Sequence, residues 1–289
     1  MNRRTYLGTI ATGVAGLATA GTTAAESGTD GVPGYVSTRG HFDIAWGEEY
    51  LTDGHDETDY DVDGTIPGLS GSAPDELVVM LHGYNQTPAE AREDIIEPAA
   101  AGFQAGGYDG PVVGYTWDSK FSNLQWWDTV EIAEQNGPKL AAYCRDYAQK
   151  NPGTALRVVG HSLGAEVILN AIEQLDDWGA HDAIDTVTML GAAVNDEAPS
   201  LDWEPFEDTY GEEIERSVGR FDNFYNTSDE TLTGSYEYAE WDTALGAEGI
   251  EEEPPANYVD HDVSYVDGHE TYFLADGGCV DAVVDTWSA

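Results

Sequence analysis

Basic side chains are scarce in this sequence of 289 residues, which contains 11 Lys and Arg against 55 Asp and Glu. The only lysines are Lys120, Lys139 and Lys150. Binding to a phosphate backbone requires a positively charged surface, whereas the formal net charge here is −44. The sequence therefore excludes DNA and RNA as expected partners.

The acidic residues are spread along the whole chain instead of forming one tail. In dilute buffer such a charge destabilises a compact fold by self-repulsion, but at molar salt the Debye length falls to about 3 Å and the repulsion is screened. A disordered acidic chain is disfavoured, since 41% of the residues are hydrophobic and several apolar runs are long. The composition predicts a folded protein adapted to high salt and resembles that of proteins from halophilic archaea.

Cysteine is also rare, with only Cys144 and Cys279 in the chain. Their separation excludes a metal motif of the CxxC kind. If the protein is exported, the two residues could form a disulfide. Both also fall on the apolar face of a predicted helix, so two buried thiols are an equally good interpretation.

Long uncharged runs are confined to the N-terminus, and nothing later in the chain is expected to span a membrane. Arg3 and Arg4 precede an uncharged run of mainly Ala, Gly and Thr that extends to Ala25. This order is typical of a secretory signal, and the paired arginines resemble a twin-arginine signal. The alternative, an uncleaved anchor, is disfavoured by the many Gly and Thr residues. We predict a signal peptide at residues 1–25, one domain at residues 26–289, and a secreted or cell-surface location.

Strand and helix patterns alternate along most of the chain, which predicts an α/β fold with a mainly parallel sheet and helices on both faces. Residues 26–75 predict a short β-hairpin at a sheet edge plus loops. Thr87 is the expected N-cap of one helix, and Pro138 is expected to begin another. Strands are expected at residues 77–81, 111–115, 156–159, 186–194, 221–226 and near 263–266, and further helices around residues 167–175 and 280–287.

The strongest motif is Gly160-His161-Ser162-Leu163-Gly164, of the form G-x-S-x-G. The string alone is weak evidence for a catalytic serine, because it can arise by chance in a chain with 33 glycines. The elements predicted on either side of it therefore decide the interpretation. A predicted strand ends directly before it and a predicted helix follows. This order would place Ser162 on a tight turn with its hydroxyl exposed and the positive end of a helix facing it.

His82-Gly83-Tyr84 follows the first strong strand, and an acid and a histidine follow Ser162 later in the chain. The order of these motifs, with the serine motif between the first loop and the later acid and histidine, resembles that of the α/β-hydrolase superfamily. The resemblance is to its lipase and esterase members and covers residues 75–287. The resemblance implies a triad in the order serine, acid, histidine, and an oxyanion hole formed by the N–H groups of Tyr84 and Leu163. His82 is interpreted as a residue that orders its loop, because the motif uses the backbone.

Three histidines after Ser162 are candidates for the base. His181 comes too early, in the loop before a strand. His261 is expected at the start of the last strand, whereas His269 lies in a glycine-flanked loop between that strand and the final helix. Since the resemblance places the histidine in that loop, His269 is preferred over His261.

Candidates for the acid are numerous in a chain so rich in Asp. We therefore compare them by their positions relative to the predicted strands. Asp229 follows the strand at residues 221–226, at the edge where such loops gather. Asp196 ends the preceding strand and remains the alternative. The preferred assignment is Asp229, which would hold the tautomer of His269 while His269 accepts the proton of Ser162.

Two further patterns in the sequence are weaker. Residues 59–64 match the first half of an EF-hand loop, but Ser70 replaces the required Glu and Pro67 occupies position nine, so the match is interpreted as accidental. The aromatic residues around Trp117, Trp126, Trp203 and Tyr236 could border an acyl pocket, although core packing explains most of them better. Residues 232–255 are predicted to cover the site or to form an exposed loop.

These features predict a cofactor-free, metal-free serine hydrolase that cleaves a small-molecule ester or lipid through an acyl-enzyme. An amidase, peptidase or thioesterase would use the same residues. A catalytically inactive relative that binds a ligand or partner at the cell surface is the alternative from another class, and a cation-binding surface module rests only on residues 59–64.

Overall fold

The structure, a computed structural model, describes residues 32–45, 48–120, 126–202 and 208–288. The predicted signal peptide and Trp203 lie outside the described residues. No helix within the described part of the chain is long and apolar enough to cross a membrane.

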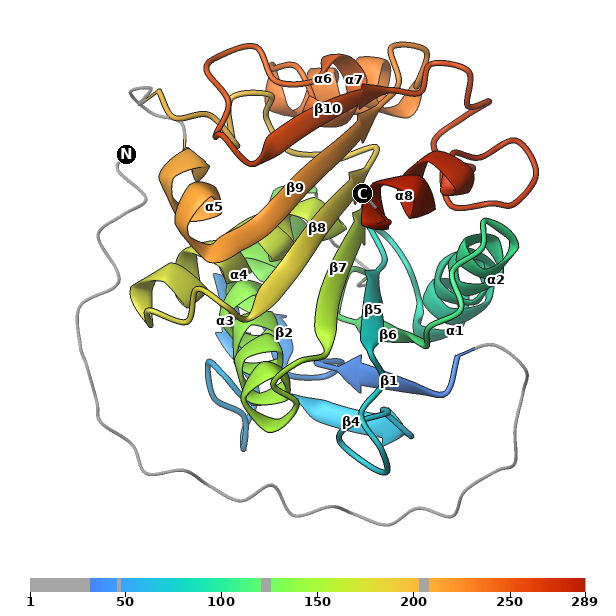
Figure 1. The fold of residues 1–289 in the computed structure, drawn as a ribbon. Helices are drawn as coiled ribbons and strands as arrows, with labels where there is room; N and C mark the ends of the chain where they lie inside the picture. Colours follow the sequence, from blue (N-terminus) through green and yellow to red (C-terminus); the bar gives the residue numbers. More distant parts are fainter. Residues whose placement is uncertain (1–31, 46–47, 121–125, 203–207, 289) are drawn as a thin grey trace.

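One eight-stranded sheet organises the molecule, in the order β10-β9-β8-β7-β5-β6-β1-β4 (Figure 1). All neighbouring strands are parallel except β1 and β4, which are antiparallel. This confirms the predicted α/β fold with a mainly parallel sheet. The strands are β1 (Gly34–Ser37), β4 (Asp61–Gly64), β5 (Glu76–Leu81), β6 (Val112–Thr116), β7 (Ala155–His161), β8 (Ile184–Leu190), β9 (Val218–Tyr225) and β10 (Tyr258–Asp262).

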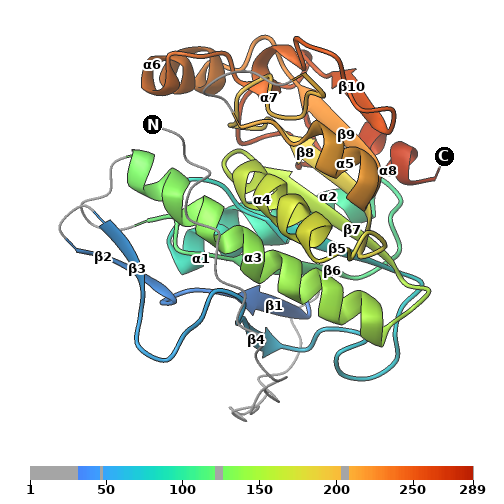
Figure 2. The same cartoon turned by 90° about the vertical axis from the view of Figure 1, so that its left-hand side faces the viewer.

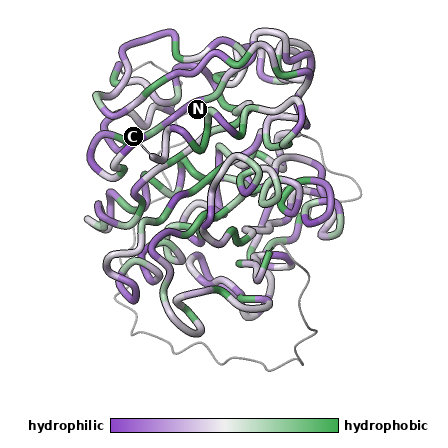
Figure 3. The backbone as a smooth tube through the Cα atoms, turned by 45° about the vertical axis from the view of Figure 1, so that its right-hand side comes forward, coloured by the Kyte–Doolittle hydropathy of each residue, from purple (hydrophilic) through white to green (hydrophobic). Residues whose placement is uncertain are grey.

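Helices cover both faces of this sheet. On one face α3 (Trp126–Lys150) packs along α4 (Gly164–Asp177), and on the other α2 (Glu97–Ala105) packs against α8 (Val280–Trp287) (Figure 2). The described chain also has α1 (Pro88–Glu90), the π-helix η2 (Ala91–Ile96), α5 (Gly211–Ser217), the π-helix η3 (Thr231–Tyr236), α6 (Glu237–Glu240) and α7 (Leu245–Glu248). Figure 3 shows the hydrophobic segments concentrated along the central strands and hydrophilic ones around them.

The two faces have separate hydrophobic cores, and the two cysteines lie in different ones. Cys144 belongs to the core beneath α3 and α4, whereas Cys279 belongs to the core beneath α2 and α8. Both are buried and free. Because the sheet lies between them, the interpretation as two buried thiols holds and the disulfide is wrong.

Three local expectations are also wrong. The early hairpin, β2 (Phe42–Ala45) with β3 (Glu48–Leu51), forms its own two-stranded sheet, while β1 and β4 extend the main one. Pro138 lies inside α3 instead of opening it, because the preceding turns bury Ile132 and Ala133 in the core and so offset the cost of an interior proline. The last strand is β10, and the buried Val263 and Val266 belong to a turn after it.

Candidate active site

Ser162 lies on a sharp turn between β7 and α4, at the carboxyl edge of the sheet. Its φ of +54° is in the left-handed region, which is strained for a residue with a side chain. Glycines allow this turn: a Cβ on Gly160 would lie 2.6 Å from the Ile168 side chain, and one on Gly164 would lie 2.9 Å from the carbonyl oxygen of His82. The local sequence therefore forms the strand, turn and helix that the motif predicts.

His269 and Asp229 contact each other directly. The Nδ1 atom of His269 lies 2.7 Å from Oδ2 of Asp229, and the Asp229 side chain is fully buried. Its other oxygen accepts hydrogen bonds from the N–H groups of Thr231 and Leu232, and the Tyr272 hydroxyl donates to Oδ2 at 3.1 Å. Burial opposes ionisation of Asp229, but these hydrogen bonds and the His269 charge outweigh it and lower its pKa.

Ser162 and His269 line the same cavity, which has a volume of about 280 Å³. Its wall comes from the turn at Ser162, the loop after β5, the loop at His269, and the covering segment, which we define as η3 and α6 (residues 231–240). The Trp126 indole N–H donates to the Glu240 carboxylate and so connects α3 to this segment. The cavity is lined by Gly83, Tyr84, Gln86, Trp126, His161, Ser162, Ala193, Thr231, Leu232, Ser235, Tyr236, Ala239, His269 and Glu270.

The loop after β5 lies against the serine. A Cβ on Gly83 would lie 2.6 Å from Cβ of Ser162, so only glycine permits this approach. Tyr84 lines the cavity, and Leu163 follows Ser162 at the start of α4. Within the described residues, neither of their N–H groups donates a hydrogen bond to the protein, so both can face a developing negative charge.

His82 holds this loop in place. Its Nε2 accepts from the N–H of Trp117 at 3.2 Å and from Arg39 at 2.9 Å, so its proton is on Nδ1 and is donated to the carbonyl of Gly83. Burial, together with the Arg39 charge, lowers the pKa of His82 well below its usual value. Arg39 also donates to the carbonyl of Gln86. These contacts agree with the interpretation of His82 as a residue that orders the loop.

His161, the second residue of the motif, has a structural role that the motif itself does not predict. Its Nε2 donates to the backbone carbonyl of His269 at 2.8 Å, and its ring centre lies 4.8 Å from that of His269. Burial first, and then the His269 charge, lowers the pKa of His161 to about 3, so it is neutral. A histidine directly before the serine was the available signal, but sequence alone does not show which loop it contacts.

The alternative residues lie elsewhere. His261 is on β10, where it pairs with Asp222, and His181 is exposed beside Asp176. Asp196 does not contact a histidine. Burial and the neighbouring Glu197 raise its pKa well above the usual range.

The carboxylates of residues 59–64 do not converge on one point. Asp59 contacts His55 and Lys139, Asp61 contacts His41, and Asp63 contacts Arg92. Residues 61–64 also form strand β4, so their side chains alternate in direction. The arrangement is not that of an EF-hand loop.

A strand–turn–helix at Ser162 on a mainly parallel sheet is the architecture of an α/β-hydrolase. The chain matches the family described as "Alpha/beta hydrolase of unknown function (DUF900)" over residues 65–262. The protein belongs to this family. No curated protein matched the sequence.

Solved structures show more distant similarity. An esterase domain from Rhodothermus marinus is 14% identical, with 74% of this chain and 85% of that one covered and a TM-score of 0.39. A putative cell surface hydrolase from Lactobacillus plantarum is 10% identical, with 74% and 91% covered and a TM-score of 0.40. A Trichoderma reesei cutinase is 20% identical, with 41% of this chain and 52% of that one covered and a TM-score of 0.33. This chain therefore spans about half the length of that protein.

Proposed function

We propose that this protein is a serine hydrolase that cleaves carboxylic esters, with Ser162 as nucleophile, His269 as general base and Asp229 as the residue that orients it. The observation that carries the proposal is that the strained Ser162 turn and His269 line the same cavity. The second nitrogen of that histidine, Nδ1, is held by the buried Asp229.

Each residue has a defined step. Asp229 accepts a hydrogen bond from the Nδ1–H of His269 and so keeps the proton on Nδ1, which leaves Nε2 free to accept the proton of the Ser162 hydroxyl. The Ser162 oxygen attacks the ester carbonyl, and the N–H groups of Tyr84 and Leu163 stabilise the oxyanion. His269 then protonates the leaving alcohol, and water attacks the acyl-enzyme by the same route in reverse.

The cavity wall favours a neutral substrate with an apolar portion. Trp126, Leu232 and Tyr236 supply apolar surface on the side of the covering segment. An anionic substrate is disfavoured by Glu270, whose carboxyl group lies at the cavity wall. Neutral esters of apolar acids are therefore the preferred class, and no cofactor is required for the steps above.

The proposal includes export and a high-salt environment. The arginine pair and the uncharged run at residues 1–25 support a signal peptide, and the dispersed acidic residues support function in concentrated salt. Measurements of activity and melting temperature between about 0.1 and 3 M KCl test the salt requirement. Both the activity and the melting temperature should be lower at about 0.1 M KCl than at about 3 M KCl. Equal stability at both ends would contradict it.

The direct test is labelling by a fluorophosphonate in about 3 M KCl, where the acidic fold is screened. Labelling mapped to Ser162, and lost in Ser162→Ala, would establish an activated nucleophile. Matched p-nitrophenyl esters and p-nitroanilides then compare ester with amide cleavage, and faster turnover of the anilides would replace the ester assignment with an amidase. A folded protein that is not labelled would contradict the hydrolase and favour a ligand-binding relative.

A further inference from the structure

A second site is indicated by carboxylates outside the candidate active site. Asp196 and Glu197 follow β8, and Glu251 precedes β10. One carboxylate oxygen from each lies within 4.8 Å of the others. Asp196 is only 4% exposed, and its Oδ1, like Oε2 of Glu197, is buried without a hydrogen-bond partner in the described part of the chain.

No basic side chain among the described residues balances the charge of this cluster. The charged groups that face Asp196 are Glu197, Asp242 and Glu251, and all of them are acidic. Among the described residues, no lysine, arginine or histidine forms an ion pair with Asp196, Glu197 or Glu251. Buried carboxylate oxygens such as Oδ1 of Asp196 and Oε2 of Glu197 are costly when they have neither a hydrogen-bond donor nor a counter-charge among the described residues, so the arrangement is suited to a cation from solution.

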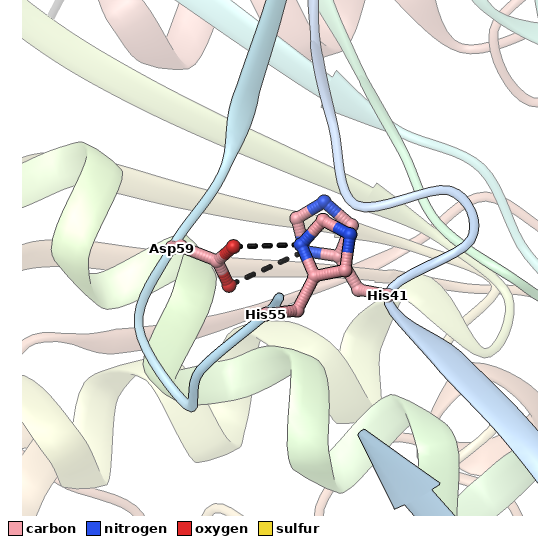
Figure 4. Close-up of side chains that lie close together, drawn as sticks. All are labelled: His41, His55 and Asp59. Carbon is pink, nitrogen blue, oxygen red and sulfur yellow. Dashed lines mark hydrogen bonds and ion pairs between the residues drawn. The ribbon is translucent and has the colours of Figure 1, made fainter. Parts of the chain in front are cut away.

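In a different cluster of possible metal ligands, a side chain of the protein itself supplies the positive charge. Figure 4 shows His41 and His55 stacked beside Asp59. The ammonium of the fully buried Lys139 lies 2.6 Å from Oδ1 of Asp59 and 3.2 Å from Nδ1 of His41. This ammonium contacts two of the three potential metal ligands, so the cluster already contains a cation. Within the part of the chain that the structure describes, Asp196 has no equivalent of Lys139.

We propose that Asp196, Glu197 and Glu251 bind a calcium ion. Carboxylate oxygens without nitrogen or sulfur donors select hard cations. Calcium tolerates irregular coordination by six to eight oxygens, whereas magnesium requires near-ideal octahedral geometry. Glu251 is exposed, so water can complete the coordination from the outer side.

The position of the site connects it to the wall of the cavity. The N–H of Asp196 donates to the carbonyl of Thr243, and the neighbouring Asn195 pairs with Ala244. Asn195 also accepts a hydrogen bond from the Tyr236 hydroxyl of the covering segment at 2.6 Å. A calcium ion would join the loop after β8 to residues 242–251 and stabilise the base of the covering segment.

The test uses the full-length wild-type protein and two double variants in about 3 M KCl after treatment with a chelator. Asp196→Asn with Glu251→Gln removes the site. Glu252→Gln with Glu253→Gln likewise replaces two carboxylates by amides, but at exposed neighbours, and is the matched control. Calcium binding is measured by isothermal titration calorimetry and melting temperature by circular dichroism, so neither readout depends on catalysis.

We expect one saturable calcium site per chain in the wild type and in the control, and none in the site variant. At a hundredfold excess over Kd, calcium should raise the melting temperature by about 5–10 °C in the first two only. Magnesium at the same concentration should have a smaller effect. The site variant removes a buried charge and should fold at least as stably as the wild type without calcium.

Three outcomes would overturn the proposal. The absence of saturable binding to the wild type would show that Asp196 and Glu197 are neutralised by a shared proton instead. Equal responses of the site variant and the control would show that calcium acts only on the surface charge as a whole. An equal shift with magnesium would overturn the assignment to calcium.

Discussion

Two aspartate–histidine pairs in this molecule have nearly the same separation and burial of the aspartate. Asp222 and His261 lie 2.6 Å apart, and Asp229 and His269 lie 2.7 Å apart. Both carboxylates are fully buried and have lowered pKa values, in each case because hydrogen bonds and neighbouring positive charge outweigh burial. The pairing alone therefore does not define a catalytic site.

The surroundings of the two pairs differ. Asp222 also binds Arg220, and the His261 ring stacks on Phe224 at the last strand of the sheet. The carboxylate of Asp229 is instead held by backbone N–H groups and Tyr272, and His269 faces the cavity that contains Ser162. An ion-pair network fixes the first pair as structure, whereas the second leaves one imidazole nitrogen available in the cavity that Ser162, the proposed nucleophile, also lines.

The largest expected difference between the pairs is in turnover after loss of the histidine. His269→Gln should lower kcat for a p-nitrophenyl ester by about four to six orders of magnitude, because it removes the proposed general base. His261→Gln should change kcat by less than about threefold, because it does not line the cavity. Steady-state kinetics in about 3 M KCl measures both. A comparable loss in His261→Gln would reverse the assignment of the base.

Substitutions of the two aspartates should also differ in their effects on turnover. Asp229→Asn should lower kcat about 10³- to 10⁴-fold, because the His269 tautomer is no longer held. Asp222→Asn should leave kcat nearly unchanged but lower the free energy of unfolding by about 1–3 kcal/mol, since Arg220 and His261 lose a buried partner. Kinetics and denaturant unfolding are measured on the same samples. Unaffected turnover in Asp229→Asn would remove it from the site.

A smaller effect is expected from His161, which positions the His269 loop. His161→Leu leaves the His269 carbonyl without its donor and should lower kcat about 10- to 100-fold with little change in KM. His161→Gln retains an N–H donor and should restore most of the activity. Equal losses in both variants, accompanied by equal losses of stability, would indicate a packing role only.

The smallest expected effect is on stability in acid. Because the folded-state pKa values of Asp222 and Asp229 lie below the unfolded value of about 3.9, their contributions are present above that pH and are lost as the pH falls through the folded values. The difference in melting temperature between wild type and Asp222→Asn should therefore narrow below about pH 4. A difference that is constant from pH 6 to pH 2 would contradict this linkage.

Local sequence determined much of the fold. Apolar runs and helical spacing indicated most strands and helices, because these patterns depend on contacts between near neighbours in the chain. The capping box at Thr87 and Glu90 forms as expected, with reciprocal hydrogen bonds between the two residues. The turn at Ser162 was also indicated locally, since the residues that allow it lie within two positions of it.

Tertiary structure decided what local patterns left open. The choice between His269 and His261 depends on which loop reaches Ser162, and Asp229 and His269 are 40 residues apart in the sequence. Asp196 was a candidate acid by position, but folding places it among carboxylates instead of beside a histidine. Pro138 was expected to begin a helix, yet core packing carries α3 through it. In each case the deciding contact joins segments distant in sequence, and only the packed fold specifies such contacts.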